Sequence, residues 1–398
     1  MKNYLLLLTG ILMVLFGGCN VESQENKFPY QKISISDYES SSQVDFDEYL
    51  NQIVADVDII ALQTGNAPQI KRIKKITNFN NKIFIYQGHS YPLLVFNQNG
   101  NYIQSIAVFG KGPQEVNELR DYDILSDGSV VILDYQIIHH YDKNYEYNHE
   151  VLLSNLPGTG ASFAPMNIKY QNENILLWDG SGVSSANALL AINPKEKSAD
   201  EYIKIINPSS PGTPFRISSF GDTLLIIPPF LNDTIYQFFD GKCIPRYFVN
   251  FPSALSNAST KHSSTDERNF QELYQYIFDH QIAAILDGFE TTHFFAFNYM
   301  YNTRMYRGIF NKSAKTVITS IDYGFEDLFN FPVSSVKYAD KTHLISVIEP
   351  YIITRLISDG KTACAFLPET RRLQLLKKLK DVKETDNPVL MLVTFKEQ

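Results

Sequence analysis

The chain of 398 residues has little cysteine and only one tryptophan. Three cysteines occur, and two of them, Cys243 and Cys364, lie in different parts of the chain. A protein of this size needs no disulfide to stabilise its core, so we expect both to be buried free thiols. The chain has no CxxC or HExxH spacing for zinc and no GxSxG sequence for a serine hydrolase. The neighbouring His139 and His140 would point to opposite faces of a strand and could not share an ion without distortion. We therefore expect no metal and no cofactor.

An excess of positive charge is also missing. Lys and Arg number 35 against 43 Asp and Glu, which gives a formal net charge of −8. Such a surface repels nucleic acid and anionic lipid headgroups, so we expect no nucleic-acid partner. After residue 16, the apolar runs are broken every few residues by polar ones, so no later stretch is expected to span a bilayer.

The start of the chain has the pattern of a lipoprotein signal. The apolar stretch Leu5–Phe16 follows a basic residue and ends in two glycines directly before Cys19. Small residues before a cysteine at the end of a short apolar region are typical of a lipoprotein cleavage site. We expect residues 1–18 to be a signal peptide, Cys19 to carry the lipid (palmitate), and residues 19–32 to be a flexible tether. An ordinary signal peptide with an incidental cysteine is the alternative.

Residues 33–398 show a repeated strand unit. Short apolar runs end at Gln87, Asp134 and Asp179, and comparable strand ends recur along the chain at steps of 45 to 51 residues. A period in this range, with several short strands per repeat, is typical of a β-propeller. Asn99-Gly100 and Asp127-Gly128 lie between apolar runs, as expected of turns that join neighbouring strands. The sequence predicts an all-β fold with six blades.

Two departures from the repeat are informative. The unit before blade five is too long, and apolar residues in Asp266–Leu286 recur at helical spacing, so we expect an amphipathic helix in an insertion at about residues 255–288. Blade six lacks its last strands, and a basic helical stretch, Pro368–Lys380, follows. We expect Val57–Leu62 and Val389–Phe395, from opposite ends of the chain, to complete it, which would remove an exposed sheet edge.

The chain resembles the six-bladed β-propeller lipoproteins of Gram-negative bacteria that display many surface lipoproteins. The matching pieces are 58–62 (DIIAL), 95–100 (VFNQNG), 109–115 (FGKGPQE) and 386–392 (DNPVLML). The layout is also similar to propellers built from NHL-type repeats. Gln114 stands where a second glycine is common in the family's loop. The resemblance implies architecture and an outer-membrane location, periplasmic or at the cell surface, and it implies no catalytic residues.

The ends of equivalent second strands should gather at one mouth of the central channel. Aromatic faces beside carboxylates and amides suit a sugar or a peptide, because a flat face stacks while polar groups fix orientation. The alternative is that such residues cap turns and fill blade interfaces. The candidate ligand-binding residues are Gln87, His89, Glu115, Arg120, Asp134, Tyr135, Trp178, Asp179, Asn298 and Glu349.

These features favour a lipid-anchored binding or scaffold propeller over an enzyme. We expect it to be a monomer that recognises a glycan, a peptide or a membrane-protein partner at the channel mouth, and to contact the membrane only through its lipid. The alternative is a lyase or hydrolase that uses channel carboxylates or a histidine-bound metal. A purely structural partner of a membrane complex is a third class, and it predicts an exposed apolar patch.

Overall fold

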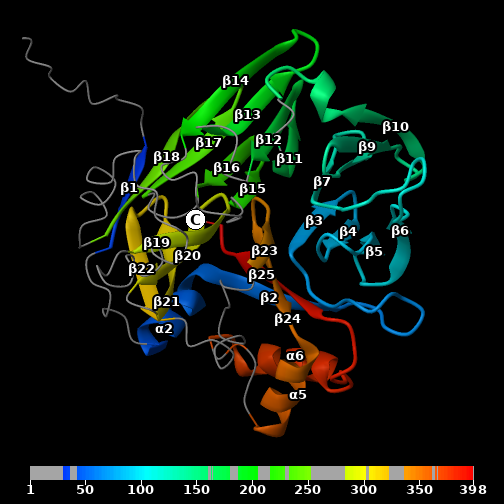
Figure 1. The fold of residues 1–398 in the computed structure, drawn as a ribbon. Coiled ribbons are helices and arrows are strands. Elements are labelled where there is room, and N and C mark those ends of the chain that lie inside the picture. The colour runs from blue at the N-terminus through cyan, green and yellow to red at the C-terminus, as the bar shows by residue number, and fades with distance from the viewer. Residues whose placement is uncertain are drawn as a thin grey trace, which may run out of the picture. The chain divides into compact units, whose positions relative to one another are not determined.

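Six sheets form the fold of Gln31–Gln398 (Figure 1). The computed structural model describes residues 30–35, 43–159, 163, 165–179, 187–204, 216–228, 233–251, 283–301, 304–321, 336–360, 364 and 366–397. Blade one contains β3 (Lys75–Phe79), β4 (Lys82–Tyr86), β5 (Leu93–Asn97) and β6 (Tyr102–Ile106), and blade two contains β7 (Asp121–Ile124), β8 (Val130–Leu133), β9 (Ile137–Tyr141) and β10 (Tyr147–Leu152). A short 3₁₀ helix, η1 (Leu153–Asn155), follows blade two.

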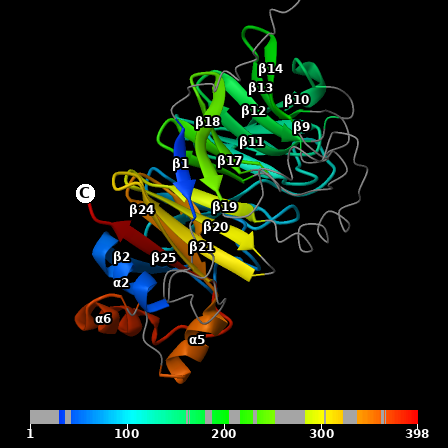
Figure 2. The ribbon, with the colours of Figure 1, turned by 90° about the vertical axis from the view of Figure 1, so that its left-hand side faces the viewer.

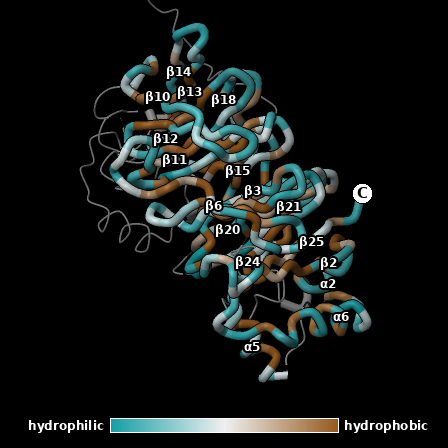
Figure 3. Tube along the Cα trace, turned by 90° about the vertical axis from the view of Figure 1, so that its right-hand side faces the viewer, coloured by the Kyte–Doolittle hydropathy of each residue, from teal (hydrophilic) through white to brown (hydrophobic). Residues whose placement is uncertain are grey.

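The remaining blades repeat the same order of strands. Blade three contains β11 (Pro165–Gln171), β12 (Asn174–Asp179), β13 (Asn187–Asn193) and β14 (Ser198–Lys204), and blade four contains β15 (Arg216–Phe220), β16 (Thr223–Ile227), β17 (Thr234–Phe239) and β18 (Lys242–Asn250). Blade five contains β19 (Ala284–Glu290), β20 (Phe294–Tyr301), β21 (Arg304–Asn311) and β22 (Thr316–Ile321). Apolar strands alternate with polar turns along the trace in Figure 3. The six-bladed all-β prediction is confirmed.

Blade six is assembled from both ends of the chain. It contains β23 (Val336–Ala339), β24 (His343–Ile348), β25 (Val389–Phe395) and β2 (Val54–Ala61), and β2 pairs antiparallel with β25. In Figure 1 the blue β2 lies beside the red β25. The predicted closure by terminal strands is therefore confirmed, with β2 beginning three residues earlier than expected.

Asn387 fixes the entry into the closing strand. Its side chain is buried, its amide nitrogen donates to the carbonyls of Gln63 (2.7 Å) and Pro68 (3.1 Å), and its oxygen accepts from the amide of Ile70 (2.8 Å). Pro388 follows directly and favours an extended conformation for Asn387. The Asn-Pro pair therefore joins the last strand to the segment that leads into blade one.

The N-terminal segment also contacts two other blades. Strand β1 (Gln31–Ser34) pairs parallel with β18 as a fifth strand of blade four, and helix α2 (Gln43–Ile53) packs against β22 of blade five (Figure 2). The guanidinium of the fully buried Arg307 lies 4.4 Å from the centre of the Phe46 ring. The sequence does not predict the pairing of β1 with β18.

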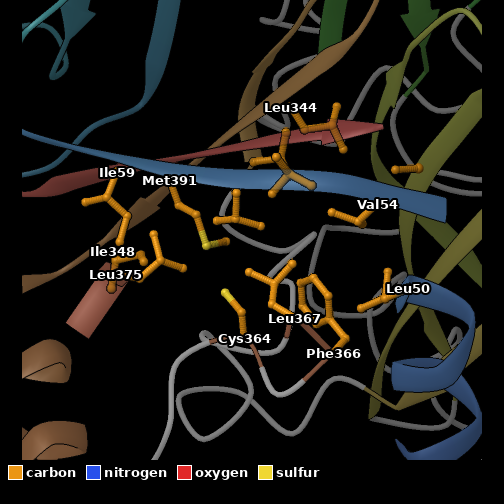
Figure 4. Packing of buried hydrophobic residues seen from close by; sticks show 14 of the residues in the cluster. Leu50, Val54, Ile59, Leu344, Ile348, Cys364, Phe366, Leu367, Leu375 and Met391 are labelled. Atoms are coloured by element: carbon orange, nitrogen blue, oxygen red, sulfur yellow. The ribbon is translucent and has the colours of Figure 1, made fainter. Parts of the chain in front are cut away.

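Two helices cover one face of blade six. Helices α5 (Pro350–Ser358) and α6 (Glu369–Leu379) lie between β24 and β25 in the chain, and α6 confirms the predicted basic helix. Figure 4 shows Leu375 of α6 and Phe366 in one apolar cluster with Ile59 of β2 and Met391 of β25. Arg371 binds Asp56 through two nitrogens and donates to the Val57 carbonyl (2.8 Å), so α6 protects the outer edge of β2.

Two expectations need correction. The predicted helix Asp266–Leu286 falls largely on residues 252–282, which lie outside the described residues, but its last positions belong to β19. The apolar residues recur at helical spacing as far as Ile285, but Ile285 belongs to β19 and packs in the core beside blade four. The predicted Asn99-Gly100 turn joins β5 to β6, and Gly100 has a positive φ of +81°. The cysteine prediction holds for Cys364, which is a buried free thiol, whereas the free thiol Cys243 is only partly buried.

Gly100 provides a test of ring closure. A Cβ there would lie 2.2 Å from the Ala61 carbonyl at the end of β2, whereas a Cβ at Gly65, with a similar φ of +85°, would meet nothing. The positive φ alone costs a non-glycine residue about 1–2 kcal/mol. We expect Gly100→Ala to lower the free energy of unfolding by at least about 1 kcal/mol more than Gly65→Ala, because it also forces β2 away. Urea denaturation of both variants measures this, and equal losses would contradict it.

Candidate functional site

The first strand of each blade lines the central channel. The six first strands are β3, β7, β11, β15, β19 and β23, each at one edge of its sheet. Among them, β7 contacts β11, β15 contacts β19, and β23 contacts β3, β15 and β19. At one end they enclose a cavity of about 340 Å³. Its lining comes from all six blades: Lys74, Lys75, Tyr86, His89, Arg120, Asp121, Met166, Asn167, Lys169, Ile217, Ser218, Asp287, Phe289, Val336 and Lys337. A smaller cavity of about 50 Å³ shares several of these residues, including Lys75, Lys169 and Lys337.

Two buried carboxylates on β7 hold two of the channel lysines. Asp121 accepts from the Lys75 ammonium (2.7 Å), and Asp123 accepts from the Lys169 ammonium (2.5 Å). The other oxygen of each carboxylate accepts from a backbone amide of β11, that of Ile168 (3.1 Å) and that of Tyr170 (2.7 Å). Burial lowers the pKa of Lys75; Asp121 opposes this effect and Lys169 adds to it. Each carboxylate thus joins a lysine to blade three, and Lys75, Asp121 and Lys169 line the cavity.

Arg120 forms the rim between blades two and three. Its guanidinium lies 4.2 Å from the centre of the Tyr135 ring, donates to the Pro165 carbonyl (3.3 Å) and pairs with Glu118 (3.5 Å). His89 approaches the same Glu118 carboxylate from blade one, at 3.4 Å. Tyr135 remains 49% exposed. The rim therefore presents a half-exposed aromatic ring, a guanidinium and an imidazole together.

The structure brings three of the ten predicted residues together: His89, Arg120 and Tyr135. Gln87 lies one strand outward, where its buried side chain accepts from the Lys71 amide (2.8 Å). Asp134 accepts from the backbone amides of Tyr135 and Asn117, which makes it a turn cap below the rim.

The other predicted residues lie elsewhere. Trp178 is fully buried among apolar residues of blades three and four, and Asn298 is buried in the second strand of blade five. Glu115 closes its own loop by accepting from the Gly112 amide (2.7 Å), beside Gln114 at a φ of +68°. Glu349 directly precedes α5, and burial raises its pKa. Asp179 ends β12, opposite Pro165, and its side chain lies outside the described part.

Sequence reasoning missed the channel lysines and their partners. The signal that could have found them is the presence of polar side chains at alternate positions of the first strands, namely Asp121 with Asp123 and Asn167 with Lys169. In a strand, residues two apart share a face, so a polar face on an innermost strand indicates a channel. The prediction instead used the ends of the second strands, which lie at the same mouth but one strand farther out.

Within the described residues, no group of three or more histidine, cysteine or acidic side chains is arranged to hold a metal ion. In the same part of the chain, no helix combines the length and the apolar character that a membrane span requires.

The fold and the channel define this protein as a six-bladed β-propeller with a polar central cavity. Its residues 32–394 match the family described as "Domain of unknown function (DUF4934)", and the chain belongs to that family. A search of curated proteins gives no match.

Several solved structures are similar in fold. A "Putative exported protein" from Bacteroides fragilis is 17% identical with a TM-score of 0.68, and the match covers 92% of this chain and all of that one. A gluconolactonase from Xanthomonas campestris is 9% identical with a TM-score of 0.46, covering 87% of this chain and 93% of that one. PorZ, a surface component of the type IX secretion system of Porphyromonas gingivalis, is 9% identical with a TM-score of 0.34, covering 72% and 36%. At these identities the similarity concerns the fold alone.

Asp134 offers a pH test of its structural role. Burial alone would raise the pKa of its carboxyl, but His139 and the amides of Tyr135 and Asn117 outweigh burial and hold the pKa below its usual range. The stabilisation that the Asp134 carboxylate provides is therefore complete above its pKa in the unfolded chain, about 3.9. It is lost as the pH falls through the lower pKa of the folded state. We expect Asp134→Asn to cost about 1–3 kcal/mol at pH 7 and progressively less in acid. Urea denaturation from pH 7 to pH 2.5 measures this, with the exposed Asp222→Asn as the control; a difference independent of pH would contradict it.

Proposed function

We propose that this protein is a lipid-anchored extracytoplasmic propeller that binds a glycan, a peptide or a protein at the mouth of its channel. The observation that carries this proposal is the cavity of about 340 Å³ lined by polar side chains from all six blades. Its volume lies at the small end of the range of about 300–1,000 Å³ for ligand pockets, so it suits one end of a ligand rather than a folded domain.

The proposed extracytoplasmic location is inferred from the first residues of the chain. The apolar stretch Leu5–Phe16 and the glycines before Cys19 have the pattern of a lipoprotein signal. The similar B. fragilis protein is named as exported, which agrees with this proposal. We place the propeller at the outer membrane, held by lipid on Cys19, as in the six-bladed lipoproteins that the sequence resembles; its layout is also similar to that of NHL-type propellers.

A binding role fits the channel better than hydrolysis or elimination does. The buried carboxylates Asp121 and Asp123 accept hydrogen bonds from lysines and from backbone amides. Both oxygens of each carboxylate are thus occupied by donors that belong to the channel wall. We therefore assign these two residues to the structure of the channel wall.

The mouth can be tested with arrays of glycans and peptides probed with the full chain in detergent. We expect a binder whose affinity falls by about tenfold in Tyr135→Ala, because stacking on an exposed aromatic face contributes about 1–1.5 kcal/mol. The matched control is Phe239→Ala, which removes a ring of similar exposure (50%) from the β17–β18 turn. Binding that is unchanged in Tyr135→Ala, or lost equally in both variants, would contradict the assignment of the mouth.

Lipid attachment has an independent test. We expect cells that express the protein to incorporate a palmitate analogue into the wild type and into Cys243→Ser but not into Cys19→Ser, because the lipidation machinery uses only the cysteine after the signal peptide. Gel fluorescence of the purified protein measures the label. Label retained in Cys19→Ser would refute the anchor and leave the channel proposal standing.

A further inference from the structure

The channel cavity is lined by positive groups although the chain as a whole is acidic. Five cationic side chains line it, from Lys74, Lys75, Arg120, Lys169 and Lys337, against two carboxylates, Asp121 and Asp287. The formal charge of the whole chain is −8. Asp121 is 2% exposed and makes contacts toward β11, whereas the Lys75 side chain is 22% exposed. Lys75 is thus the more exposed residue of this pair, and its ammonium already donates to Asp121 and to the Tyr122 carbonyl (2.7 Å).

Two polar atoms of the cavity wall have no hydrogen-bond partner among the described residues. They are Nε of Arg120 and Oδ1 of Asn167, and both residues line the cavity. The Arg120 side chain is 90% buried, with its other nitrogens already directed at Pro165 and Glu118. A buried donor without an acceptor costs about 1–3 kcal/mol, and more for a charged group. A ligand with acceptor oxygens would recover this cost.

We propose that the ligand is an acidic saccharide, with a sugar carboxylate inside the cavity near Arg120 and Lys75 and a sugar ring against Tyr135. This inference rests on the proposed binding function and names its ligand class. The carboxylate oxygens accept from Nε of Arg120 and from the lysine ammonium groups, in charge-assisted hydrogen bonds.

A saccharide fits the rest of the wall better than an acidic peptide does. Oδ1 of Asn167 is an acceptor and needs a donor. A uronic acid carries hydroxyl donors on the same ring as its carboxylate, whereas the nearest donors of an Asp or Glu residue are on the peptide backbone. Tyr135 has one face on the Arg120 guanidinium and is half exposed, so it offers the flat surface on which a sugar ring packs.

The probes are uronic-acid oligosaccharides, such as trigalacturonate and the corresponding glucuronate and mannuronate oligomers, each paired with its methyl ester. The ester keeps the size and the hydroxyls and removes the charge. By calorimetry on the full chain in detergent, we expect at least one uronate to bind about tenfold or more tightly than its ester, as the loss of a charged hydrogen bond predicts. Raising the salt concentration should weaken uronate binding and leave ester binding unchanged.

The variant Arg120→Gln should lower uronate affinity by about tenfold or more and change ester affinity little, while Arg120→Lys should retain part of the difference. The control is Lys195→Gln, which removes one charge from an exposed ion pair on blade three. Thermal melting checks that Arg120→Gln is folded. If Arg120→Gln is not folded, the ester comparison and the salt dependence of the wild type test the proposal instead.

Equal binding of uronates and their esters would overturn the inference, and so would binding of triglutamate without any uronate. In both cases the proposed binding function survives, provided that Tyr135→Ala weakens the observed binding. Absence of binding to every uronate, neutral glycan and peptide would overturn both.

Discussion

The pairing of β2 with β25 is the interaction on which the rest of the structure depends. It joins residues more than 300 positions apart, from Val54↔Phe395 to Ala61↔Val389, and converts a row of sheets into a closed ring. Only in a ring do the six first strands face a common channel, so every side chain of the cavity is positioned through this pairing. Asn387 reinforces it, because one buried amide side chain satisfies groups of Gln63, Pro68 and Ile70 at the same point.

The N-terminal segment likewise contacts elements that are far away in the sequence, and it does so in three blades. Within residues 31–61, β1 adds to blade four, α2 packs on β22 of blade five, and β2 closes blade six. Loss of any one blade therefore exposes apolar surface that belongs to its neighbours, such as Ile33 beside blade four and Phe46 beneath Arg307. The ring is stabilised by cross-blade packing as well as by the closing strands, which favours cooperative unfolding.

The blades can be predicted from the sequence, whereas the residues that line the channel cannot, and the reason is physical. Second strands are apolar on both faces, as in Val130–Leu133 and Thr223–Ile227, and they recur with a period that one can read directly. First strands are half polar and their periodicity is weak, so the helix predicted over Asp266–Leu286 extends into the first residues of β19, and the channel lysines are not predicted. Trp178, the only tryptophan, was chosen for its chemistry, yet its position in the middle of an apolar strand favours the core, where it lies.

Charge in this protein is placed at the interfaces between blades, and this links the stability of the ring to the chemistry of its channel. Asp121 and Asp123 connect β7 to β11 and at the same time hold Lys75 and Lys169. Glu290 does the same between blades four and five, with Arg246, Tyr247 and Lys312. A buried carboxylate with several donors is costly to disturb, so these partners have little freedom. The two channel lysines are therefore held in place before any ligand arrives, which lowers the ordering cost of binding.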